Sequence, residues 1–434
     1  MRHVLSMTAA GSIGLIAVFL VDLLSLIYIS RLGDPKLTAA VGFGTQVQFF
    51  ATSLHIGLAI AIGAVVSRAL GAGKRDRARR LAGASLALGA ALSVATVAIL
   101  WPLRHQILTL LGAQGETRDI AATFLSITLP ANLFFSLGMS LSAILRAAGD
   151  ARRSMYVTLF GGVTTAILDP IFIFGFELGV QGAAIVIVLS RLVFLIVGWH
   201  GAARAHDLVG APSRTTFGAD LGAILAIAGP AVLTNIATPV GQSFAVRVFS
   251  GFGEPAVAAF AMIDRIVPVA FGVLFALSGS VGPIMGQNLG AKLFDRVQRT
   301  LTDCLIIVAV YVVVIWLVLW LAGPTIVWLF GAQGEAARIV LFFCALGALT
   351  WLFLGGLFVA NAAFNNLGFP LLSTAFNWGR ATLGTIPFVT LGAQIGGPEG
   401  GLVGMIAGAA LFGTGAMTTA YFVTRRLAKT KAAP

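Results

Sequence analysis

Two aspartates lie inside long apolar segments of the sequence, where a charged side chain is costly. Asp22 lies midway along the first apolar segment, and Asp169 precedes Pro170 in a later one. A charge at the centre of a membrane helix costs about 2.5–3.5 kcal/mol on insertion scales, so each carboxyl group needs a reason to be there. Because burial disfavours the charged form of a carboxyl group, these two side chains are candidates for proton exchange near neutral pH.

Both aspartates also have a structural explanation. Pro170 interrupts the hydrogen-bond ladder of its helix, and an aspartate beside it can accept the freed backbone hydrogen bonds. Asp22 could pair with a neighbouring helix and do nothing more. The residue types alone leave the functional and the structural interpretations open.

Other polar residues within apolar segments suggest a substrate cavity. Aromatic rings among the 31 phenylalanines would suit flat, lipophilic cations through stacking and cation–π contacts, although most of them should face lipid or pack. Arg247 could join a buried cluster with Asp264 and Arg265, or extend to the membrane interface. His55 could titrate near neutral pH or only pack. The cavity candidates are Tyr28, Gln46, Gln242, Asp264, Arg265 and Asn361.

Metal, cofactor and enzyme chemistry find little support in the sequence. Cys304 and Cys344 lie in apolar segments, which favours buried thiols over a disulfide or a metal site. An intramembrane enzyme would need convergent catalytic groups, and His55 stands alone. We therefore expect no metal, no cofactor and no enzymatic activity.

Membrane helices must position these residues. The chain of 434 residues is 58% apolar and 10% charged, whereas a soluble domain carries about 25% charged residues. Its apolar segments of 18 or more residues are long enough to cross a bilayer as helices. We predict an all-α polytopic membrane protein with about twelve spans, at residues 8–30, 38–68, 81–101, 120–145, 155–176, 179–200, 219–250, 256–287, 300–322, 336–363, 370–392 and 399–424.

The net charge of +12 follows the membrane topology and does not indicate a nucleic-acid site. Basic residues gather in alternate loops, and acidic residues lie in the opposite ones, as the positive-inside rule expects. The first apolar segment is full length and lacks a cleavage signal, so we interpret it as a span. The pattern predicts a multi-pass membrane protein with both termini in the cytoplasm. Tryptophans near the span ends suggest an interfacial belt: Trp101, Trp199, Trp320 and Trp328.

The sequence repeats itself at a constant offset, which is the separation between Gly112 and Gly331. The pentapeptide GAQGE begins at each of these glycines, and Gly149 matches Gly368 at the same offset. Six spans in each half give both halves the same orientation in the membrane, as in parallel-repeat transporters. We predict two parallel six-helix bundles, residues 1–200 and 219–434, joined by a cytoplasmic linker at 201–218 and facing a central cleft. In this arrangement GAQGE is a structural corner and not a binding site.

Motifs along nearly the whole chain resemble the multidrug and toxic compound extrusion (MATE) transporters, with a lean toward the DinF-like branch. The resemblance implies a two-bundle fold and drug/cation antiport activity. The motifs, each weak alone, are specific in their order and spacing: Ser30-Arg31-Leu32-Gly33-Asp34, Val66-Ser67-Arg68, Leu145-Arg146-Ala147-Ala148-Gly149-Asp150, Ile167-Leu168-Asp169-Pro170 and Gly286-Gln287-Asn288-Leu289-Gly290-Ala291.

The resemblance implies a functional role for Asp169, because MATE proteins carry a functional acid in this Leu-Asp-Pro motif. The family's usual acid in the first span aligns with Ser25, and Asp22 lies one helical turn away on the same face. Thr165 stands where the family usually has asparagine, and Ile187 stands where it often has threonine. We predict a proton-coupling site rebuilt around Asp22 and Asp169, with Ser25 and Thr165.

A secondary antiporter that exports amphipathic, often cationic, compounds in exchange for protons is the leading hypothesis. The second half lacks the acids that a sodium-coupled branch of the family keeps, which favours protons over sodium. A flippase for lipid-linked sugars is the first alternative, although mid-span arginines are few: Arg191, Arg247 and Arg265. We expect small-molecule substrates, a lipid bilayer around a monomer, and no nucleic acid.

Overall fold

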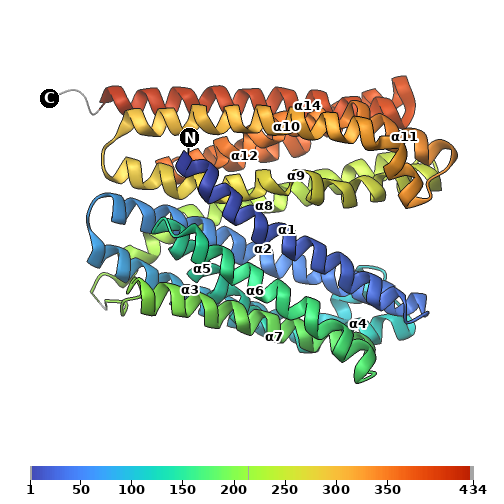
Figure 1. Cartoon of the computed structure of the whole chain (residues 1–434), viewed down its shortest axis with the longest axis horizontal. Coiled ribbons are helices and arrows are strands. Elements are labelled where there is room, and N and C mark those ends of the chain that lie inside the picture. Colours follow the sequence, from blue (N-terminus) through green and yellow to red (C-terminus); the bar gives the residue numbers. More distant parts are fainter. Residues whose placement is uncertain (1, 214, 431–434) are drawn as a thin grey trace. The chain divides into compact units, whose positions relative to one another are not determined.

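The computed structural model describes residues 2–213 and 215–430, and within these ranges it is helical with no strand (Figure 1). The described chain divides into two compact units. One runs from Ala9 to Val232, and the other comprises Leu233–Pro434 with Met1–Thr8. The helices are α1 (Arg2–Ser30), α2 (Pro35–Gly71), α3 (Arg75–Leu110), α4 (Gly115–Thr128), α5 (Asn132–Ala147), α6 (Ala151–Pro170), η1 (Ile171–Gly175), α7 (Gly179–Trp199), η2 (His200–Ala205), α8 (Phe217–Ser250), α9 (Glu254–Gly290), α10 (Phe294–Phe330), α11 (Gly334–Ala345), η3 (Gly347–Leu349), α12 (Thr350–Leu367), α13 (Pro370–Gly379), η4 (Arg380–Gly384) and α14 (Ile386–Thr430).

The number of spans agrees with the sequence prediction. Ten helical segments of the described chain are long and apolar enough to cross a membrane, and the bent pair α4–α5 makes eleven. The 60-residue segment Pro370–Lys429 is one of the ten, and it is broken inside α14, where Gly396 and Gly397 leave helical geometry. Counting its two arms separately gives twelve. The chain is a multi-pass, all-α membrane protein.

The span predicted at residues 120–145 is bent and not one continuous helix. The chain bends by 51° between α4 and α5. Pro130 lies at this bend, and a proline has no N–H and clashes with the carbonyl group four residues earlier. That carbonyl belongs to Ser126, and the Trp101 indole N–H donates to it at 3.3 Å.

The matching span of the second half, predicted at 336–363, is also interrupted. The 3-10 turn η3 separates α11 from α12. Trp316 donates its indole N–H to the Ala345 carbonyl at 2.7 Å. Ser126 and Ala345 are matching positions of the repeat, so both halves satisfy the same freed carbonyl with a tryptophan from another helix.

The two GAQGE segments are corners between helices, as predicted. Gly112 and Gly331 have φ of 96° and 64°, and Gly115 and Gly334 have φ of 52° and 55°. These are left-handed conformations that favour glycine. The last glycine of each segment begins the next helix, α4 or α11, and places a glutamate in the first turn, where it complements the helix dipole.

The polar segment near mid-chain packs against the helices of the first unit. Its first residues form η2, and the Gly210 amide then donates to the Arg79 carbonyl at 3.1 Å. A Cβ on Gly83 would lie 1.9 Å from the Gly210 carbonyl oxygen, so the segment passes directly over the α3 backbone. The region predicted as a linker is therefore held in place over part of its length.

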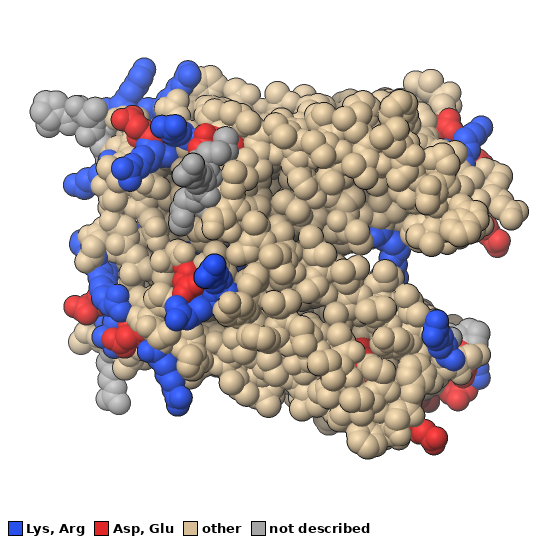
Figure 2. All heavy atoms as spheres, in the orientation of Figure 1, with Lys and Arg blue, Asp and Glu red and all other residues tan. Residues whose placement is uncertain are grey.

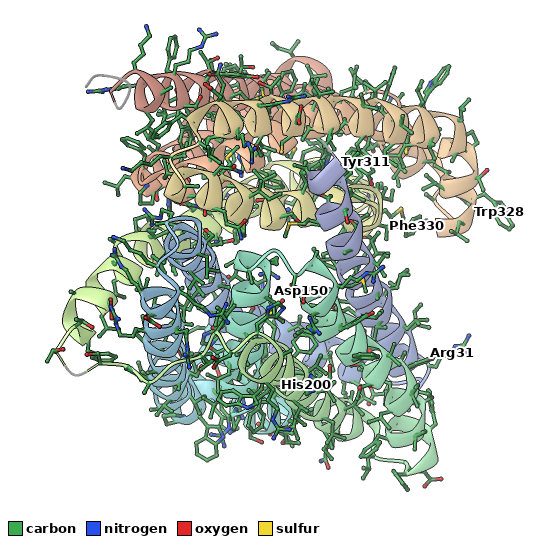
Figure 3. All side chains as sticks on the ribbon, turned by 60° about the vertical axis from the view of Figure 1, so that its left-hand side comes forward. Arg31, Asp150, His200, Tyr311, Trp328 and Phe330 are labelled. Atoms are coloured by element: carbon green, nitrogen blue, oxygen red, sulfur yellow. The ribbon has the colours of Figure 1, made fainter. Side chains whose placement is uncertain are left out.

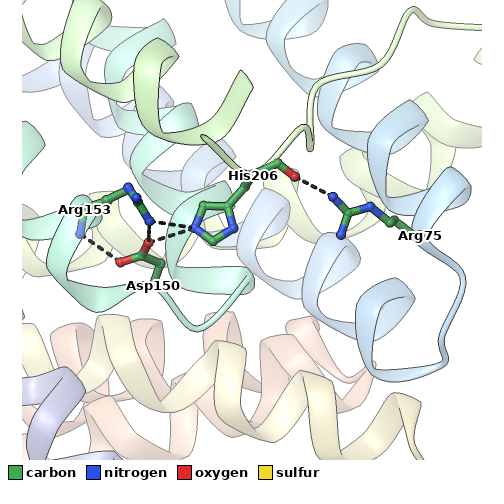
Figure 4. Close-up of polar contacts among 4 residues, drawn as sticks. All are labelled: Arg75, Asp150, Arg153 and His206. Carbon is green, nitrogen blue, oxygen red and sulfur yellow. Dashed lines mark hydrogen bonds and ion pairs between the residues drawn. The ribbon is translucent and has the colours of Figure 1, made fainter. Parts of the chain in front are cut away.

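An ionic cluster ties this segment to two helix ends (Figure 4). Asp150 caps α6 through the Arg153 amide at 3.0 Å, and its carboxylate contacts the Arg153 guanidinium at 2.6 Å and His206 Nε2 at 2.7 Å. Arg75 donates to the His206 carbonyl at 2.5 Å. Partial burial raises the pKa of Asp150, but the bonds from Arg153 and His206 outweigh it and hold that pKa below its usual value.

Charged and aromatic residues are distributed as a membrane protein requires. On the face shown in Figure 2, Lys and Arg side chains gather at helix ends and the middle of the helices is largely uncharged. Trp328 lies at the far end of α10, and its side chain points away from the helices (Figure 3). The four tryptophans predicted to form an interfacial belt are all exposed: Trp101, Trp199, Trp320 and Trp328.

Candidate functional site

Asp169 lies at the end of α6, where the helix passes into the π-helical turn η1. Its side chain is 2% exposed, and the Ser25 hydroxyl of α1 donates a hydrogen bond to Oδ2. These two residues are far apart in the sequence, one in the first span and one in the fifth. The structure thus brings together the residue of the Leu-Asp-Pro motif and the residue that aligns with the usual family acid in the first span.

Asp22 lies one helical turn before Ser25 on α1, as the sequence predicted. It is exposed, and it is close enough to Asp169 and Arg191 for the charges to interact. No ion pair within 4 Å joins Asp22 to a basic residue in the described chain. Asp22 is thus exposed and without an ion pair, whereas Asp169 is buried.

Two further candidates flank this pair of acids. Thr165 lies one turn before Asp169 on α6 and donates its hydroxyl to the Gly161 carbonyl at 3.2 Å, so it is occupied by its own helix. Tyr28 follows Ser25 on α1, and its ring meets the Phe174 ring edge-on at 5.9 Å. Tyr28 thereby adds an aromatic surface beside the acids.

A hydrogen-bonded network that the sequence interpretation missed lies in the same unit. Arg191 of α7 donates from Nη1 to the Thr128 carbonyl at 3.1 Å and to Asn132 Oδ1 at 2.8 Å. Asn132 in turn donates to Gln48 Oε1 at 3.0 Å. These acceptors lie at the bend between α4 and α5 and on α2. Pro130 and the mid-span Arg191 were the available signals, but neither showed which helices would meet.

His55 lies buried beside this network. It is 1% exposed, neither ring nitrogen has a hydrogen-bond partner in the described chain, and its ring centroid is 6.5 Å from that of Phe135. Gln48 Nε2 is also buried without a partner among the residues that the structure describes. The interior of this unit thus holds polar groups beyond the two acids.

Four other cavity candidates lie on the surface of their own units. Gln46 on α2 and Gln242 on α8 are exposed, and so are Asp264 and Arg265 on α9. No ion pair links Asp264 with Arg247 or Arg265 in the described residues, so the buried ionic cluster considered from the sequence does not form.

Asn361 belongs to a different polar cluster, in the second unit. It is buried, and its Oδ1 accepts from Asn377 Nδ2 at 3.0 Å. Ser373 donates to the Asn361 carbonyl at 3.2 Å and to Asn365 Oδ1 at 3.3 Å. All members are neutral, so this cluster offers hydrogen bonds without a charge.

Metal-ligand groups are not assembled in the described part of the chain. No cluster of three or more His, Cys, Asp or Glu side chains occurs there. Cys304 and Cys344 are buried free thiols, as predicted.

Comparison with known proteins identifies the fold and the family. The family model described as MatE matches the chain twice, at residues 12–171 and 230–390. The second match is displaced from the first by the repeat offset, to within one position at either end. A crystal structure of the Vibrio cholerae MATE transporter VcmN in a bent form superposes with a TM-score of 0.93 at 26% identity, covering 98% of this chain and 97% of that one.

Two curated relatives cover most of the chain. The FAD transporter of Shewanella oneidensis is 26% identical over 418 residues, which is 93% of this chain and 90% of the relative. The multidrug export protein MepA of Staphylococcus aureus is 26% identical over 353 residues, which is 80% of this chain and 76% of the relative. Because the family model covers well over half of the sequence, the chain belongs to the MatE family and is a membrane transporter, not an enzyme.

Proposed function

We propose that this transporter is an antiporter that exports amphipathic, often cationic, small molecules in exchange for protons. The observation that carries the proposal is the pairing of Asp169 with Ser25, with Asp22 exposed one turn away. A relative that is a multidrug export protein supports the export of such compounds.

In this proposal protons and substrate compete for the two aspartates. An ionised Asp169 accepts the Ser25 hydroxyl in a charge-assisted hydrogen bond, which is stronger than a neutral one. Protonation removes that charge and weakens the contact between α1 and α6. Exposed Asp22 attracts either a proton or the cationic part of a substrate. Because both ligands compete for the same negative charge, binding of a proton displaces the substrate cation.

The membrane orientation is part of the same proposal. The positive-inside rule supports both termini in the cytoplasm of a bacterial cell, with the chain in the plasma membrane. We propose that it works as a monomer. In this orientation protons enter from outside and the substrate leaves the cell.

The decisive test is transport of a fluorescent cation in proteoliposomes with proton and sodium gradients imposed separately. Asp169→Asn should abolish efflux driven by the pH gradient, because the side chain can no longer release a proton. Asp22→Asn tests the second acid in the same way. Phe388→Leu is the matched control, since Phe388 occupies the position of Asp169 in the second half and should leave coupling intact.

Efflux that persists in Asp169→Asn would refute the proton assignment. Efflux driven by sodium alone would favour the sodium-coupled alternative. A flippase for lipid-linked sugars remains the second alternative, and it would move a labelled lipid without either gradient.

A further inference from the structure

Arg191 lies in the middle of α7, where a permanent charge is costly and indicates a function. It has no acidic partner within 4 Å in the described chain. The groups that it contacts are the neutral Thr128 carbonyl and Asn132 amide. Arginines inside membrane proteins pair with carboxylates or with backbone carbonyls, and Arg191 uses only one carbonyl and one amide, which leaves its positive charge without a bonded carboxylate.

One side of the Arg191 side chain is fixed in place. Nη1 makes both hydrogen bonds, Asn132 is itself held by Gln48, and the Phe135 ring lies 5.3 Å from the guanidinium carbon. These contacts restrict the rotation of the guanidinium plane. A group that is held in one orientation loses less entropy when it binds a ligand.

The other side of the guanidinium is available. Nε and Nη2 donate no hydrogen bond to any described residue, and the side chain is half-buried and not sealed in the core. Two parallel N–H groups of arginine match the two oxygens of a carboxylate or a phosphate. Lysine lacks this fork geometry.

The charges of the site are mixed. Asp22 lies close enough to interact with Arg191 electrostatically, and Ser25 links Asp169 to the same helix. With both acids ionised, the three groups carry one net negative charge. The site therefore presents a carboxylate for a cation and, beside it, a guanidinium for an anion.

We propose that Arg191 binds the carboxylate or phosphate of a transported substrate, so that the preferred substrates are amphipathic molecules that carry both an anionic and a cationic group. The inference rests on the transport function proposed above and specifies the substrate class of that site. Asn132 and Gln48 act as positioning residues that orient the guanidinium.

The test uses a pair of probes that differ only at the anionic group. Rhodamine B carries a carboxylate and a delocalised cation, and its ethyl ester keeps the cation alone. Fluorescence anisotropy of the purified full-length transporter measures the affinity for each probe. Arg191→Gln should weaken binding of rhodamine B by about tenfold or more, the scale of a lost charged hydrogen bond, and leave the ester unchanged or bound more tightly. Arg191→Lys keeps the charge without the fork and should give an intermediate loss.

Arg380→Gln is the matched control. Arg380 is also a mid-span arginine, and it donates from Nη2 to Thr238 Oγ1 at 3.3 Å in the second unit. Its replacement should change the affinities for both probes equally or not at all.

Equal losses for the two probes in Arg191→Gln, or no loss for either, would overturn the anion-binding role. The proposed transport function fails separately, if neither probe is moved by an ion gradient in proteoliposomes. The difference in binding between the acid and its ester still decides the inference in that case.

Discussion

Asp169 and Phe388 occupy matching positions of the repeat, but the helices around them approach each other differently in the two halves. In the second half the two arms of the last hairpin touch through their backbones. A Cβ on Gly408 would lie 1.8 Å from the Gly384 carbonyl oxygen, and one on Gly404 would lie 2.1 Å from that of Phe388. No side chain fits between backbones this close.

The first half carries larger side chains at the same place. Thr165 stands where the second half has Gly384, and Ile185 stands in place of Gly404. A close backbone approach also occurs at Gly182 of α7, whose Cβ would lie 2.6 Å from the Phe172 carbonyl oxygen. The threonine and isoleucine side chains at these two positions exclude the close backbone contact that the matching glycines make in the second half.

A second pair of matching regions also differs between the two halves, here in charge. Between α5 and α6, Arg146 donates from Nη1 to Ser142 at 2.8 Å and to Ser154 at 3.0 Å. The matching positions of the second half hold a neutral cluster, which consists of Asn361, Asn365 and Ser373. The duplicated architecture has kept its helices and corners, but at two matching positions a charged residue of the first half, Asp169 or Arg146, is replaced by the neutral Phe388 or Asn365. We infer that coupling to ions resides in the first half.

The largest effect is expected at Gly404, where a substitution would disturb the close backbone contact of the second half. Gly404→Ala forces a methyl group against the Phe388 carbonyl, and such overpacking costs about 1–3 kcal/mol or more. We expect a clear fall in the melting temperature of the detergent-solubilised protein. Gly279→Ala in α9 is the control, because nothing lies within 4 Å of its added Cβ. Equal melting temperatures for the two variants would contradict the close backbone contact.

The difference in charge between the halves can be tested at Ser154 and Ser373, which are matching positions of the repeat. Ser154→Ala removes one acceptor from the Arg146 guanidinium, a bond of about 1.5–3 kcal/mol, and also the hydroxyl contact with Ser142 at 2.8 Å. Ser373→Ala removes only the neutral contacts at 3.2 and 3.3 Å, each worth about 0.5–1.5 kcal/mol. Thermal unfolding should therefore show the larger loss for Ser154→Ala. The reverse order would mean that the amide cluster, and not the charged one, stabilises its half more.

The smallest effect is expected at the loop before α6. Asp150 caps that helix, whereas α13 has Phe369 at the matching position and no side-chain cap. Asp150→Ala should cost about 1 kcal/mol at neutral pH, the usual loss for an N-cap residue. Because its pKa is lowered in the folded state, Asp150 stabilises the protein above the unfolded pKa of about 3.9. That contribution is lost as the pH falls through the lower folded value.

Melting temperatures measured between pH 7 and pH 3 would follow this dependence, and the difference between the parent and Asp150→Ala should narrow toward the acidic end. Asp150→Asn retains a cap but not the charge, so its difference from the parent should become the smaller of the two there. Phe369→Asp adds a cap to α13 and should raise the melting temperature slightly. A constant difference across the pH range would exclude an electrostatic role for Asp150.

Much of the architecture could be predicted from the sequence because it depends on local properties. A segment of about 20 apolar residues spans a bilayer wherever it occurs, so the number of spans was correct. The repeat offset and the glycine corners were likewise visible, since left-handed turns favour glycine in any context. Asp22 and Asp169 could be identified for the same reason, since a charged residue inside an apolar segment is visible in the sequence.

The tertiary structure alone decided which of these groups meet. The bond between Ser25 and Asp169 and the contacts of Arg191 with Thr128 and Asn132 depend on how each helix is rotated about its axis and on the 51° bend at Pro130. Those rotations follow from packing against several helices at once. Hydropathy and spacing record the length and polarity of one helix, but not which face of it meets which neighbour.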